Sequence, residues 1–125
     1  MNKLQFAMAM QSRTKLFAIE IIRFYAKLPK NDEARVVGRQ LLRSGTSIAA
    51  NYRALCRSKS RADFIHKLGT VVEEVDETTF WLELLEEGAI CQAGNCAPLH
   101  KEAGELLRIL QTSLKTAKFN RSQIH

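Results

Sequence analysis

The feature that most constrains the fold is a long amphipathic repeat between residues 61 and 87. Its seam has alternating spacings of three and four residues, which is typical of one face of a helix in a bundle. The seam consists of Phe64 with Ile65, Leu68, Val72, Val75, Thr79 and Leu82. Ser60 and Asp63 suit the first turn of a helix, and Gly88 suits its end. The pattern predicts one long helix from about residue 61 to residue 87.

Three other segments carry apolar stripes at helical spacing, and we expect helices at about residues 13–28, 32–57 and 98–118. Ser12 and Asn31 suit the starts of the first two helices, Pro29 ends the first, and Pro98 begins the last. The connection to the last helix is expected over residues 89–96.

No strand alternation competes with these helices. The sequence therefore predicts an all-α fold, namely an antiparallel up-down-up-down four-helix bundle that forms a single domain over residues 12–118. Residues 1–11 and 119–125 are expected to be flexible ends.

Gly45 occupies a position that the second apolar stripe assigns to the helix interface. The stripe keeps one heptad phase through Val37, Leu41, Gly45, Ile48, Tyr52 and Leu55. A glycine inside a helix costs about 1 kcal/mol relative to alanine. Because the phase continues across Gly45 without a slip, we expect an unbroken helix and another backbone packed very close to it.

The charges are divided along the chain. Residues 1–62 hold thirteen Lys or Arg against three acids, whereas residues 63–87 hold eight acids against one lysine. The remaining residues, 88–125, hold five bases against two acids, and the net charge of the whole chain is +6. Such a chain can attract a polyanion with one face and a neighbouring copy of itself with another.

Arginines recur at four-residue intervals in the basic half. The two sets are Arg35, Arg39 and Arg43, and Arg53, Arg57 and Arg61. Residues four apart share a helix face, and guanidinium groups bind phosphate oxygens in a bidentate manner. We therefore predict that these six arginines contact a nucleic-acid backbone. The alternative interpretation is a solvated face, or pairing with the carboxylates of a neighbouring helix.

Metal binding has little support. Glu73 and Glu77 share a helix face, but di-metal bundles also need a Glu-x-x-His motif, which the sequence lacks. Cys91, Cys96 and His100 have the spacing C-x4-C-x3-H, without the C-x2-C pair that is usual in zinc sites, and Cys56 lies far away in sequence. We expect two loop thiols and a surface imidazole, with no metal and no cofactor.

Enzymatic chemistry is not indicated either. Ser44, Thr46 and Ser47 have no histidine base near them in sequence, so nucleophilic catalysis is not expected. The start of the chain lacks a signal sequence, and no apolar run is long enough for a membrane span. Three cysteines without the spacing of a disulfide framework fit reduced thiols. These observations predict a cytoplasmic protein that is not an enzyme.

Three sequence motifs carry a family resemblance. They are RSGTSIAANYR at residues 43–53, DFIHKL at residues 63–68, and Glu77-Thr78 through Trp81-Leu82 to Leu84-Leu85. In this order and spacing the chain, over about residues 12–118, resembles the bacterial four-helix-bundle family of proteins encoded in intervening sequences of 23S ribosomal RNA genes. It is also similar to the accessory variability proteins of diversity-generating retroelements.

The resemblance implies an antiparallel four-helix bundle that assembles into a homopentameric ring and has no catalytic residues. It implies that the first motif is structural and that its side chains satisfy each other's hydrogen bonds; these residues are Ser44, Gly45, Thr46, Ser47, Asn51 and Tyr52. For the retroelement relatives it implies a basic surface that binds nucleic acid and a reverse transcriptase partner. For the intervening-sequence proteins, RNA binding is inferred.

One departure from the family pattern concerns the third helix, which often carries basic residues in that family. Here the helix is acidic, through Glu73, Glu74, Asp76 and Glu83. We therefore expect it to face a neighbour's basic surface in a head-to-tail ring, rather than nucleic acid.

Together these observations predict a non-enzymatic homo-oligomer that binds RNA or DNA through a basic surface. The alternative is a structural or adaptor protein that docks a protein partner such as a reverse transcriptase. In that case the charges serve self-assembly.

Overall fold

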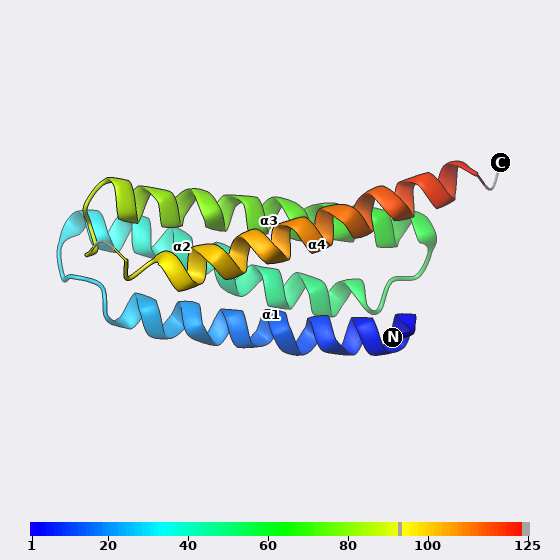
Figure 1. Cartoon of the computed structure of the whole chain (residues 1–125), viewed down its shortest axis with the longest axis horizontal. Helices are drawn as coiled ribbons and strands as arrows, with labels where there is room; N and C mark the ends of the chain where they lie inside the picture. Colours follow the sequence, from blue (N-terminus) through cyan, green and yellow to red (C-terminus); the bar gives the residue numbers. More distant parts are fainter. Residues whose placement is uncertain (93, 124–125) are drawn as a thin grey trace.

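The computed structural model describes residues 1–92 and 94–123 and contains four helices in an up-down-up-down arrangement (Figure 1). They are α1 (Lys3–Ala26), α2 (Asp32–Leu55), α3 (Arg61–Glu87) and α4 (Ala97–Ser122). The described ranges contain no strand, so the predicted all-α four-helix bundle is confirmed. Ala93, in the predicted connection, and residues 124–125, in the predicted flexible end, lie outside the described residues.

The predicted ends of the bundle need correction. α1 begins at Lys3 rather than near residue 13, because Asn2 and Gln5 form a reciprocal capping box in which the Asn2 side chain accepts from the Gln5 N–H at 2.8 Å. Ser12 is therefore inside the helix, and residues 3–11 are not a flexible end. Likewise, α4 continues through residues 119–122, so this part of the predicted C-terminal flexible end is helical.

Each helix packs against the next one along the chain, whereas α1 and α4 touch little. Figure 1 shows α4 crossing the bundle at an angle, with its C-terminal turns extending beyond the rest of the molecule. The edge between α1 and α4 is therefore the open side of the bundle. None of the helices in the described ranges is long and apolar enough to cross a membrane.

At Gly45, α2 lies very close to a side chain of α1. A Cβ atom added there would lie 2.9 Å from two side-chain carbons of Ile21, which is fully buried. Gly38, one heptad earlier, stands in the same way against Tyr25 of α1 and against Leu28, which follows α1. The helix is unbroken and closely packed at Gly45, but the expected neighbouring backbone is wrong, because the nearest atoms belong to the Ile21 side chain.

The buried seam of α3 differs from the predicted one at its start, where Phe64 is exposed and Ile65 is only partly buried, and at two later positions. Val71 and Thr78 are completely buried, whereas Val72 and Thr79, predicted to face the core, are only partly buried. Both choices keep spacings of three and four, so the sequence period alone does not separate them. The buried seam is Leu68, Val71, Val75, Thr78, Leu82 and Leu85.

Thr78 is buried because it has a polar partner on α2. Its hydroxyl oxygen lies 2.9 Å from the Ser44 hydroxyl and 2.8 Å from the Glu74 carbonyl oxygen. Thr46 donates to the Leu42 carbonyl oxygen at 2.7 Å. The Ser44 and Thr46 hydroxyls thus bond to backbone carbonyls and to α3, rather than to each other as the resemblance implied.

Candidate nucleic-acid interface

One side of α2 forms a basic surface that runs along most of the helix. We call it the α2 arginine face; it consists of Arg35, Arg39, Arg43 and Arg53, all of which are exposed. At 3.6 residues per turn these side chains fall within a sector of roughly 80°, and from Arg35 to Arg53 the helix rises about 27 Å. The core-facing side of α2 is occupied by its buried residues, so the arginine face points to solvent.

Arg57 and Arg61 do not continue the ladder on one helix, although their spacing predicted a second set with Arg53. α2 ends at Leu55, two residues before the predicted end, and the Arg57 N–H donates to the Ala54 carbonyl oxygen in the turn that follows. Arg61 is the first residue of α3. Both arginines are exposed and extend the basic surface around this end of the bundle.

Carboxylates from α3 engage one member of the face. Arg43 pairs with Glu77 and, at 3.4 Å, with Glu74. The hydrogen bond from Arg43 lowers the pKa of Glu77, and the same bond raises the pKa of Arg43. Burial instead raises the pKa of Glu74. Arg43 is therefore partly committed to holding α2 against α3.

The other arginines differ in whether a carboxylate pairs with them. Within the described part of the chain, Arg35 pairs only with Asp32 on its own helix, and the Asp32 side chain is 89% exposed. Among residues 1–92 and 94–123, four of the six predicted arginines make no ion pair, namely Arg39, Arg53, Arg57 and Arg61. An exposed guanidinium without a carboxylate keeps all its donors for an external anion.

The outer side of α3 carries the opposite charge. We call it the α3 acidic face; it consists of Glu73, Asp76, Glu83 and Glu87, all of them exposed. Phe80 lies in the middle of this face with 48% of its surface exposed. Its ring packs against the Trp81 ring edge to face, with 5.0 Å between the two ring centroids. A large exposed aromatic side chain among carboxylates is typical of a protein interface rather than of a phosphate-binding surface.

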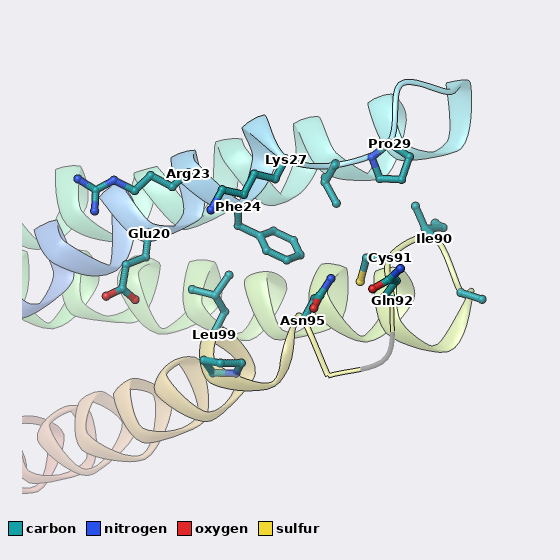
Figure 2. Close-up of a pocket in the computed structure, with 13 residues that line it drawn as sticks. Glu20, Arg23, Phe24, Lys27, Pro29, Ile90, Cys91, Gln92, Asn95 and Leu99 are labelled. Carbon is teal, nitrogen blue, oxygen red and sulfur yellow. The ribbon is translucent and has the colours of Figure 1, made fainter.

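The open edge between α1 and α4 contains a cleft of about 890 Å³ (Figure 2). Figure 2 shows Phe24 projecting from α1 toward the α3–α4 connection, with Leu99 at the start of α4 on the opposite side. Arg23 and Lys27 line the α1 side of the cleft. The sequence does not predict this cleft, because the cleft depends on how far apart α1 and α4 lie.

Farther along this edge, Arg13 holds the two helices together. Its guanidinium donates twice to Glu102, at 2.7 and 2.8 Å, and once to Glu105 at 2.7 Å. These bonds, with the Glu102 bond as the largest cause, raise the pKa of Arg13. The clamp joins helices that otherwise touch little.

The predicted loop residues are only partly brought together. Cys91 and Cys96 lie side by side, whereas Cys56 follows α2 at the opposite end of the bundle, and His100 lies 3.7 Å from Glu83. Within the described residues, no three side chains of the metal-binding types gather into a possible site.

Comparison with known families places the chain. A family model described as 23S rRNA-intervening sequence protein matches residues 7–112. The chain belongs to this family. The region that matches the intervening-sequence family includes residues of all four helices and most of α4. No curated protein matches the chain.

A solved structure supports the same assignment. It is described as a protein with unknown function from the S23 ribosomal protein family of Bacteroides thetaiotaomicron. The two chains are 33% identical and superpose with a TM-score of 0.80, and the match covers 87% of this chain and 97% of the other. The intervening-sequence bundle described above is therefore a fold shared with a solved relative.

Proposed function

We propose that this intervening-sequence family member is a non-enzymatic protein that binds the backbone of RNA or DNA through the α2 arginine face together with Arg57 and Arg61. The observation that carries the proposal is the exposure of Arg39, Arg53, Arg57 and Arg61 without carboxylate partners in the described residues. Guanidinium groups along α2 and in the turn that follows it suit the regularly spaced phosphates of a nucleic acid.

The binding is expected to be largely independent of sequence. Phosphate contacts position a protein on a nucleic acid, but sequence is read through base edges or by base stacking. The α2 arginine face presents no exposed aromatic ring, and its exposed apolar neighbour is Val36. Arg43 is the weakest contributor in this proposal, because Glu74 and Glu77 already neutralise it.

The proposal includes self-assembly into a ring, with a pentamer as the expected form from the family resemblance. Two exposed surfaces support assembly: the α3 acidic face with Phe80, and an apolar stripe on the outer side of α1 formed by Leu4, Met8 and Ile22. A head-to-tail arrangement would place acidic and basic surfaces of neighbouring copies together. It would also repeat the arginine face around the ring, so that one nucleic acid could meet several copies.

The experiment compares two triple charge reversals of equal size. The first is Arg39→Glu, Arg53→Glu and Arg57→Glu. The matched control is Lys101→Glu, Arg108→Glu and Lys115→Glu, three exposed bases on one side of α4. Binding to a labelled structured RNA and to a DNA duplex is measured by fluorescence anisotropy, with circular dichroism as the check that the variants fold. We expect the first variant to lose binding and the control to retain most of it. Equal losses in both variants would overturn the assignment to α2.

The second candidate function is a structural or adaptor role, in which the chain docks a protein such as a reverse transcriptase. The specific observation in its favour is the Arg43 pairing with Glu74 and Glu77, since it shows that this arginine already serves helix packing. Under this proposal the arginine reversal would disrupt the oligomer, and neither nucleic acid would bind the unmodified protein at low salt.

A further inference from the structure

The two thiols of the α3–α4 connection lie close enough to react with each other. The sulfur atoms of Cys91 and Cys96 are 2.9 Å apart, and both cysteines are free. A disulfide bond is about 2.05 Å long. A small movement of one side chain therefore brings the two sulfur atoms to bonding distance.

Backbone hydrogen bonds attach each of the two cysteines to a different helix. The Leu85 carbonyl oxygen in α3 accepts from the N–H groups of Ile90 and Cys91, at 3.0 and 3.2 Å, and lies 3.6 Å from the Cys91 sulfur. The Cys96 carbonyl oxygen accepts from the His100 N–H at 2.9 Å, which makes Cys96 the N-cap of α4. Cys91 is thus fixed to the end of α3, and Cys96 to the beginning of α4.

The two thiols differ in access to solvent. Cys91 is half-buried and lines the cleft in Figure 2, so a small molecule that enters the cleft can reach its sulfur. Cys96 is completely buried, and burial raises the pKa of its thiol to about 12. Because the thiolate is the nucleophile, Cys91 reacts first and Cys96 second.

We propose that Cys91 and Cys96 form a reversible intramolecular disulfide that ties the end of α3 to the start of α4. In the first step the Cys91 thiolate attacks one sulfur of a small-molecule disulfide such as oxidised glutathione. This forms a mixed disulfide and releases one glutathione thiolate. In the second step Cys96 loses its proton and attacks the Cys91 sulfur, which releases the second glutathione. Two protein thiols are oxidised, and one glutathione disulfide is reduced to two thiols.

Cys56 supplies an internal reference. It is exposed at the C-cap of α2, and Figure 1 places this end of α2 at the opposite end of the bundle from the α3–α4 connection. Cys56 therefore cannot join the pair within one chain. Replacing it by Cys56→Ser removes the one cysteine of the three that is exposed, and leaves the pair unchanged.

The test uses the full chain carrying Cys56→Ser, equilibrated with glutathione buffers from fully reduced to fully oxidised. The samples are quenched with acid, denatured, alkylated and analysed by intact mass. We expect two alkylated thiols in the reduced buffer, and no alkylated thiol and no bound glutathione in the oxidised buffer. A reductant is expected to restore both thiols. The oxidised chain is also expected to melt at a higher temperature than the reduced chain, because the cross-link limits the unfolded state.

The matched control adds Cys91→Ser in the same background. This variant keeps Cys96, which is expected to remain alkylated after denaturation at every glutathione ratio, and its melting temperature is expected not to respond to oxidation. Two outcomes would overturn the proposal. One is that both thiols of the Cys56→Ser chain stay alkylated in fully oxidised buffer. The other is that the oxidised end state carries a glutathione adduct instead of an internal disulfide.

Discussion

At the scale of single residues, the packing of α1 on α2 depends on a missing side chain. Gly45 is buried in mid-helix, where glycine is unfavourable, and the heptad phase that continues across it predicted a close approach. The close approach is present, but the neighbour is the Ile21 side chain rather than another backbone. The seam of α3 was harder to predict, because Thr78 is buried through its contact with Ser44, and a pattern within one helix contains no information about that partner.

Replacing Gly45 by alanine is expected to destabilise the protein by about 1–3 kcal/mol, even though alanine is the better helix former. The new Cβ would lie 2.9 Å from the branched, fully buried side chain of Ile21. The matched control is Gly69→Ala in α3, where no atom lies within 4 Å of the added Cβ. This control is expected to gain about 0.5–1 kcal/mol. Urea unfolding measures both, and a stable Gly45→Ala variant would contradict the packing account.

At the scale of elements, the starts of α2 and α3 follow from their capping residues, whereas the start of α1 does not follow from its apolar stripe. Asn2 and Gln5 carry the signal that could have located it, since together they make a capping box. The buried Met10 and Thr14 extend the core ahead of the predicted start. Because the prediction used only the most apolar residues of α1, it placed the start of the helix about ten residues too late.

The contact between α2 and α3 is expected to depend on pH through Glu77. Its pKa in the folded protein lies below the ordinary value of 4.5, so the stabilisation from Arg43 is present above that pH and is lost as the pH falls through the folded value. The pKa of Glu74 is raised by burial, and removal of Arg43 would raise it further. Glu74 therefore also makes the stability lost with Arg43 larger at neutral pH than at acid pH.

We therefore expect the stability advantage of the unmodified protein over Arg43→Gln to be largest near pH 7 and to shrink toward pH 3. Urea unfolding at the two pH values measures this difference. The matched control is Arg39→Gln, since Arg39 has no carboxylate partner among the described residues. Its difference from the unmodified protein is expected to stay constant. An Arg43→Gln difference that does not change with pH would argue against the ion pair.

At the scale of the whole molecule, the two charged regions of the sequence lie on neighbouring helices, with the basic residues on α2 and the acidic residues on α3. The i, i+4 spacing placed Arg35, Arg39 and Arg43 on one face, because it requires only that α2 be a helix, but it grouped Arg53 with Arg57 and Arg61 instead. The Arg43 ion pairs, the α1–α4 cleft and the Cys91–Cys96 contact depend on which helices meet and at what angle. The sequence pattern holds no such information.

The proposed assembly predicts that Phe80→Ser shifts the protein toward smaller species. Phe80 is large, half exposed and surrounded by the α3 acidic face, so its burial between copies would supply apolar contact where charge alone is weak. Sedimentation velocity measures the change, with Phe119→Ser near the end of α4 as the control for losing an exposed aromatic ring. An unmodified protein that is monomeric at all concentrations would rule out this assembly.

Nucleic-acid binding is best measured as the affinity of the unmodified protein for a structured RNA and a DNA duplex across a salt series. We expect a linear fall of log affinity with log salt. For the duplex, each phosphate contact contributes a slope of about −0.9, so Arg39, Arg53, Arg57 and Arg61 together give a slope of about −3 to −4 for each bound chain. No binding at low salt, or binding that is independent of salt, would contradict the proposal that the arginine face binds nucleic acid.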